Sequence, residues 1–173
     1  MDDLFNKIVA DRGSIEGLMS KIPGFRGYME MSSRREADRM MRDHVAKQYD
    51  VQVSRFTGIE SNLVRQGGLM YMDRSKSVRT RLDNLRRRIA TDTPGYSGFF
   101  AANKIGPEAL QNVYAFDEAM LRYADQIAKD LDGLETSVSS GEGIDAAYTQ
   151  LENTISEANR AYDLRDNILN GIS

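Results

Sequence analysis

The residues of this sequence best suited to bind another molecule are aromatic and arginine side chains in two similar segments. Residues 23–28 read PGFRGY and residues 94–99 read PGYSGF, so both follow the order Pro-Gly-aromatic-x-Gly-aromatic. Arginine beside aromatic rings can grip phosphates, carboxylates or unpaired bases, and glycine permits backbone conformations that other residues resist. Two interpretations follow: the rings plug one end of a helical bundle, or they form a partner-binding surface.

The candidate partner-binding residues come from these two segments and from the arginine-rich end of the helix expected before the second segment. They are Phe25, Arg26, Tyr28, Arg86, Arg87, Arg88, Tyr96, Phe99 and Phe100. The three consecutive arginines also suit the negative end of a helix dipole. A purely structural role is therefore the alternative for them.

Enzymatic and metal-binding signatures do not appear in the sequence. His44 is the only histidine and there is no cysteine, whereas zinc sites need Cys/His clusters and di-iron bundles need Glu-x-x-His pairs. No phosphate-binding loop or nucleophile elbow is present. The sequence thus predicts a protein that is not an enzyme and that has no catalytic, cofactor-binding or metal-binding residues and no cofactor.

Charge is distributed unevenly along the 173 residues, although the formal net charge is only −3. Residues 33–90 hold fourteen Lys/Arg and seven Asp/Glu, a net charge of +7, and residues 107–173 hold four and thirteen, a net charge of −9. Such asymmetry indicates either two halves that attract each other or one face for an external anionic partner. Both interpretations stay open at this point.

Apolar residues recur at helical spacing through most of the chain, and no strand pattern competes with them. We expect helices over about 3–21, from Ser33 to Gly67-Gly68, over 69–91, from Pro107 to about 138, and over 144–170. Ser33 and Glu36 form a capping box, Gly67-Gly68 has helix-stop chemistry and proline is favoured at a first helical position. Gly13 weakens the first helix and could divide it.

These elements predict an all-α fold, an elongated antiparallel four-helix bundle made of two long helical hairpins plus a short N-terminal helix. We expect one domain over 1–173, comprising an N-terminal helix (1–22), a basic hairpin (33–91) and an acidic hairpin (107–172). The spacing over 107–170 is also typical of coiled coils. In this arrangement both six-residue segments precede an ascending helix, so we expect them at the same end of the bundle.

One stretch resembles a known group of sequences. Residues 21–46, KIPGFRGYMEMSSRREADRMMRDHVA, combine Ile-Pro-Gly-aromatic-Arg-Gly-Tyr with Arg-Arg-Glu-Ala-Asp. This is similar to a stretch in small helical proteins of bacteria. The resemblance covers about a sixth of the chain, implies a helix boundary near residue 33, and brings no function with it.

The sequence therefore favours a non-enzymatic protein that acts by protein–protein interaction, as an adaptor, scaffold or assembly subunit. The partner would be another protein or a second copy of this chain, the second case giving a homo-oligomer through the seams of the long helices. The alternative is an anionic-surface binder, for a membrane surface or nucleic acid, that uses the basic third helix and the aromatic segments. No apolar run approaches the ~20 residues that span a bilayer and no small-molecule substrate is evident, so we expect a cytoplasmic protein.

Overall fold

Every regular element of the chain that the structure describes is a helix. The computed structural model describes residues 3–11, 13, 15–28, 34–91 and 106–169, and no strand occurs in these ranges. The all-α fold predicted from the apolar periodicity is thereby confirmed. No helix among the described residues is both long enough and apolar enough to cross a membrane.

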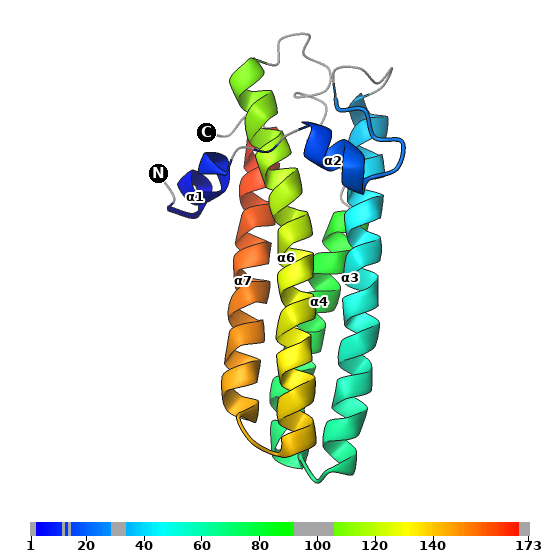
Figure 1. Ribbon diagram of the computed structural model, residues 1–173, viewed down its shortest axis with the longest axis vertical. Coiled ribbons are helices and arrows are strands. Elements are labelled where there is room, and N and C mark those ends of the chain that lie inside the picture. The colour runs from blue at the N-terminus through cyan, green and yellow to red at the C-terminus, as the bar shows by residue number, and fades with distance from the viewer. Residues whose placement is uncertain (1–2, 12, 14, 29–33, 92–105, 170–173) are drawn as a thin grey trace.

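Four long helices run side by side and give the molecule its elongated shape (Figure 1). Helix α3 (Arg34–Arg65) turns through the short 3-10 helix η1 (Leu69–Tyr71) into α4 (Met72–Thr91). Helix α6 (Pro107–Ser140) turns directly into α7 (Ile144–Leu169). Helix α3 packs against α4 and α6, and α7 packs against α6 and α4, so the two antiparallel hairpins close a helical bundle.

The turn after α3 follows from the two glycines that the sequence places there. Gly67 has a positive φ of 82°, which is readily accessible to glycine. The N–H of Gly68 donates to the carbonyl of Leu63 at 2.9 Å, and the N–H of Gly67 donates to that of Val64 at 3.1 Å. These are the two hydrogen bonds of a Schellman motif, which satisfies the last carbonyls of the helix.

The N-terminal part forms two short helices instead of one. Helix α1 (Asp3–Ala10) and helix α2 (Ile15–Lys21) lie on either side of Gly13, and both pack against α6. The single short helix expected over this region is therefore wrong, although the sequence pointed to Gly13 as the place where it could divide. Leu4, Ile8 and Leu18 bury their side chains, which fastens this segment to the bundle.

The apolar seams of the long helices meet inside one molecule. On α6 and α7 the residues predicted to line these seams, such as Ile127, Leu131, Leu151 and Ile155, are at most 1% exposed. These side chains therefore belong to the intramolecular core. The predicted self-association through the seams is not tested by this packing and stays a prediction.

The basic and acidic hairpins face each other along the bundle. Arg55 on α3 pairs with Asp132 and Glu135 on α6, the latter at 3.0 Å. Arg74 on α4 approaches Glu152 on α7 to 2.7 Å. Much of the charge asymmetry thus serves attraction between the two halves, which was one of the two interpretations of the sequence.

Candidate functional site

Two of the predicted partner-binding aromatic residues lie in the core. Phe25 is 2% exposed and Tyr28 is fully buried, with their ring centroids 5.6 Å apart in an edge-to-face arrangement. The Tyr28 ring also stacks on Tyr114 of α6 at 5.4 Å. The hypothesis that Phe25 and Tyr28 form a partner surface is therefore corrected: their burial supports the alternative that these rings plug the bundle.

The predicted basic residues point in different directions. Arg26 is exposed. Arg86 pairs with Asp50 on α3 and with Asp83, Arg87 pairs with Asp83, and Arg88 pairs with Asp163 on α7 at 2.8 Å. Since Arg86, Arg87 and Arg88 engage carboxylates of the same molecule, less of their charge is left for an external anion.

Part of the candidate set cannot be placed. Tyr96, Phe99 and Phe100, together with the second six-residue segment, lie outside the described residues, as does Ser33 of the predicted capping box. The prediction that both aromatic segments share one end of the bundle therefore stays a prediction. In the first segment, Gly24 and Gly27 both have a φ of 82°, as the Pro-Gly-aromatic pattern suggested.

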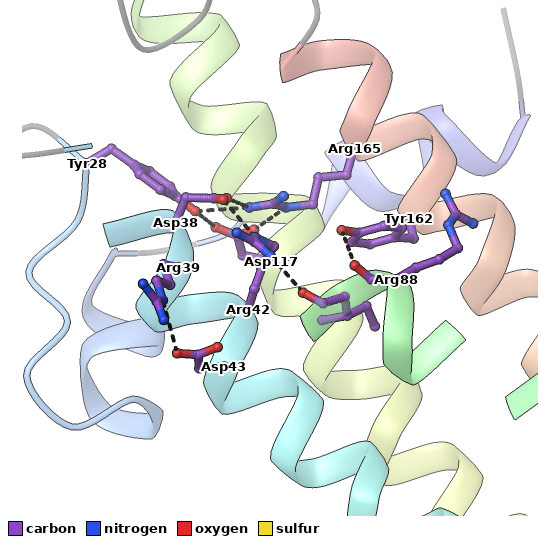
Figure 2. Close-up of polar contacts among 10 residues, drawn as sticks. Tyr28, Asp38, Arg39, Arg42, Asp43, Arg88, Asp117, Tyr162 and Arg165 are labelled. Carbon is purple, nitrogen blue, oxygen red and sulfur yellow. Dashed lines mark hydrogen bonds and ion pairs between the residues drawn. The ribbon is translucent and has the colours of Figure 1, made fainter. Parts of the chain in front are cut away.

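A buried network of charged side chains lies where the segment containing Tyr28 meets the bundle (Figure 2). Its centre is the fully buried guanidinium of Arg165 on α7, which donates to Asp117 Oδ1 at 2.7 Å and to Asp38 Oδ1 at 2.6 Å. The hydroxyl of Tyr28 donates to Asp117 Oδ2 at 2.5 Å. Arg42 donates to Asp38 Oδ2 at 2.8 Å and to the carbonyl of Ile89 at 3.0 Å.

The network joins five segments of the chain. The N-terminal segment supplies Tyr28, α3 supplies Asp38 and Arg42, and α4 supplies the carbonyl of Ile89. Helix α6 supplies Asp117 and α7 supplies Arg165. Two carboxylates and two guanidinium groups balance in charge, which a buried cluster requires. Burial raises the pKa of Asp117 to about 6, although Arg165 and the Tyr28 hydroxyl oppose this shift. Burial and the charge of Asp117 raise the pKa of Tyr28 well above its usual value, so the phenol keeps its proton.

The network is closed to solvent. Tyr28, Asp38, Asp117 and Arg165 are at most 1% exposed and Arg42 is 4% exposed. A substrate or ligand from solution would therefore have to open the bundle to reach these groups. The arrangement acts as a polar lock that holds the N-terminal segment and the four long helices in one register.

Four members of this network, Asp38, Arg42, Asp117 and Arg165, were not among the site residues predicted from the sequence. A signal was nevertheless present, because Asp117 falls between the apolar residues Val113 and Met120, and Arg165 falls between Tyr162 and Leu169. Charged residues at core spacing must either meet each other or break the core. Reading these gaps in the seams as paired charges would have pointed to the network.

Most of the exposed large apolar side chains lie on the second half of α3 and in the turn that follows it. Among the described residues, the exposed large hydrophobic side chains are Met19, Val51, Val64, Leu69 and Met70. Four of these five belong to the second half of α3 and to η1, where Leu69 is 66% and Met70 is 83% exposed. We call Leu69 and Met70 the α3–α4 tip; it lies at the foot of the molecule in Figure 1.

The comparisons with known proteins leave this site without a precedent. No protein-family model, curated protein or solved structure matches the chain. The resemblance of residues 21–46 to small bacterial helical proteins is not tested by these comparisons. Conclusions about function therefore depend on the geometry of the molecule itself.

Proposed function

We propose that this protein is a non-enzymatic interaction or assembly protein, an adaptor or scaffold, that binds a protein partner through the exposed side of α3 and the α3–α4 tip. The observation that carries the proposal is the concentration of exposed apolar side chains there. On α3, Val51 is 59% exposed and Val64 is 44% exposed, and beyond its end Leu69 is 66% and Met70 is 83% exposed. Apolar patches on a soluble protein commonly mark protein-interaction surfaces.

The distribution of polar groups supports the same function. The buried network has no member open to solvent, so its charged groups serve the packing of the bundle. Most of the predicted anion-binding arginines are engaged with carboxylates of the same chain. Both observations favour an apolar interaction over the alternative in which the basic helix binds a membrane surface or nucleic acid.

The proposal is tested by removing the apolar tip and following the partner. The full-length chain is purified with an affinity tag from the cells that make it, as wild type and as the double variant Leu69→Ser/Met70→Ser. We expect a protein, including an untagged copy of the chain itself, to co-purify with wild type and to be lost from the double variant. Met19→Ser is the matched control, since Met19 is 44% exposed on α2.

The Met19→Ser control shows whether loss of the partner is specific to the α3–α4 tip or follows from the loss of any exposed apolar side chain. Equal recovery of the same partner with wild type and the Leu69→Ser/Met70→Ser variant would contradict the proposed surface. Recovery of nucleic acid or lipid that is lost as salt rises would favour the anionic-surface alternative, because phosphate contacts weaken steeply with salt.

A further inference from the structure

The outward side of α3 carries no exposed charge between Asp50 and Arg65. We call it the α3 face, and its exposed residues are Val51, Ser54, Thr57, Gly58, Ser61, Asn62 and Val64. The two charged residues inside this stretch turn toward neighbouring helices. Arg55 pairs with Glu135 on α6 at 3.0 Å, and Glu60 pairs with Arg79 on α4 at 3.0 Å.

Helices α4 and α6 differ from α3 in this respect, whereas α7 also lacks an exposed charged residue between Asp145 and Arg160 but carries no exposed large apolar side chain there. Exposed charged residues recur along α4, as at Lys76, Arg81 and Arg87, and along α6, as at Arg122, Lys129 and Asp132. Solvent-facing sides of helices are normally charged or strongly polar. A stretch of four turns that has no exposed charge and has an exposed valine near each end therefore indicates a surface that binds a partner.

Several residues of the α3 face recur symmetrically about its midpoint, which lies between Thr57 and Gly58. Moving outward from it, Ser54 corresponds to Ser61, then Val51 to Val64, and finally Asp50 to Arg65. The two serines and the two valines are pairs of like residues and the outermost pair has opposite charges, whereas Thr57 corresponds to Gly58 and Asn62 to the half-buried Val53. An antiparallel contact between two identical helices brings each residue to the level of its counterpart, so this order suits a contact of the face with itself.

We propose that the α3 face binds the α3 face of a second copy of this chain, antiparallel and about a twofold axis near Thr57 and Gly58. This inference rests on the proposed function and identifies its partner. A twofold interface must be self-complementary, and the opposite charges of Asp50 and Arg65 fulfil this condition at the ends of the α3 face. Gly58 and the serines let two helices approach closely, while Val51 and Val64 cover the edges of the contact.

Charge complementarity fixes the direction of the pairing. In the antiparallel arrangement Asp50 of each copy lies level with Arg65 of the other, which gives two ion pairs at the ends of the contact. In a parallel arrangement Asp50 would meet Asp50 and Arg65 would meet Arg65, and like charges in contact are unfavourable. Asp50 also lies 3.3 Å from Arg86 of its own chain, yet its side chain is 55% exposed and so can accept a second cation.

The α3–α4 tip adjoins one end of this contact. Leu69 and Met70 of η1 follow Arg65 through the Gly67-Gly68 turn. The exposed tip therefore lies beside the end of the contact at which Arg65 of one copy meets Asp50 of the other.

Charge exchange across the proposed axis tests the inference on the full chain. The dissociation constant of the dimer is measured by sedimentation for wild type, Asp50→Arg, Arg65→Asp and the double variant Asp50→Arg/Arg65→Asp. We expect a wild-type dimer, a dissociation constant raised about tenfold or more in each single variant by like-charge contact, and recovery in the double variant. Only a pairing that joins these two positions predicts that recovery.

A second variant keeps the test independent of folding. Gly58→Lys places a charge at the centre of the α3 face, where an added Cβ would have no neighbouring atom within 4 Å. Lysine favours a helix more than glycine does, so the helix content should persist while the dimer is lost. Lys76→Gln on α4 removes an exposed charge elsewhere and should leave the dimer unchanged.

Failure of this inference can be told apart from failure of the proposed function. A wild-type chain that stays monomeric at every concentration, or a dimer that Gly58→Lys does not weaken, overturns the pairing of α3 faces. If a monomeric chain still loses a different co-purifying protein on Leu69→Ser/Met70→Ser substitution, the proposed function stands and only the second copy is excluded. If none of these variants alters any association, both are wrong.

Discussion

The two ends of the bundle each depart from the usual placement of charged and apolar side chains, and they do so in opposite directions. Near the first, charged residues that normally face water are buried, with Arg165 and Asp117 fully enclosed. Near the second, apolar residues that are normally buried face water, with Met70 83% exposed. The two regions lie at opposite ends of the long helices in Figure 1, so the same four helices carry both exceptions.

The difference between the two ends separates what holds the fold from what is free to act. Every charge in the buried network has a partner of opposite sign in the same chain, and the network ties the N-terminal segment to α3, α6 and α7. The α3–α4 tip has no such role, because its side chains contribute little to the core. We therefore interpret the network as a structural lock and the tip with the α3 face as the working surface.

The largest effect is expected from opening the lock. Arg165→Met leaves Asp38 and Asp117 buried without their shared cation, and removal of one partner from a buried charged cluster typically costs ~3–5 kcal/mol. Urea unfolding followed by circular dichroism measures the loss. Lys129→Met on α6, at an exposed position, should change stability by less than ~0.5 kcal/mol.

Equal stabilities of these two variants would contradict the lock. If Arg165→Met were more stable than wild type, the desolvation free energy of the buried charges would exceed the free energy gained from their pairing, as is known for some buried ion pairs. In either case the buried charges would need an explanation other than stability.

A smaller effect is expected from pH. A carboxyl group whose pKa is higher in the folded than in the unfolded protein holds its proton more tightly when folded, and burial raises the pKa of Asp117 to about 6. Its contribution therefore favours folding at low pH and is lost as the pH rises from its unfolded pKa of ~4 to about 6. Urea unfolding of wild type and Asp117→Asn across this range should show that the substitution removes this part of the slope.

Identical slopes for wild type and Asp117→Asn would mean that Asp117 titrates in the folded protein as it does in the unfolded chain. The electrostatic description of the lock would then be wrong, since it requires that burial acts more strongly on this carboxyl group than Arg165 does. The hydrogen bonds of the network would remain, but without this linkage to pH.

The smallest effect on stability is expected at the tip. Met70→Ser alters a side chain that is mostly in water, so the free energy of unfolding should change by no more than ~0.5 kcal/mol, as for other surface substitutions. The same denaturation measurement checks this. A loss comparable to that of Arg165→Met would place Met70 in the core and remove the contrast between the two ends.

Much of the fold was predictable because it depends on local chemistry. Gly67-Gly68 and Pro107 set helix boundaries through backbone preferences, and the spacing of residues such as Leu82, Leu85 and Ile89 set the buried side. The sequence also pointed to charge attraction between the hairpins, because the charges are segregated along the chain.

The buried network could not be predicted in the same way. Asp38 and Arg165 are 127 residues apart, so whether they meet depends on the packing of α3 against α7 at this level of the bundle. Phe25 and Tyr28 were taken as a surface candidate because an aromatic ring in a loop looks the same in sequence whether it is buried or exposed. The exposure of Met70 likewise depends on how the turn after α3 is folded, because methionine is common in protein cores and its residue type alone does not indicate exposure.

The central claim, that the tip end is the working surface, is tested most directly by site-specific cross-linking. A photoreactive phenylalanine analogue replaces Met70 in one variant and Met19, which is also exposed, in another. Both full-length proteins are irradiated in the cells that make them. We expect a discrete protein adduct from position 70, of the mass of a second copy if the α3 faces pair, and none from position 19. An adduct from position 19 alone, or none from position 70, would contradict it.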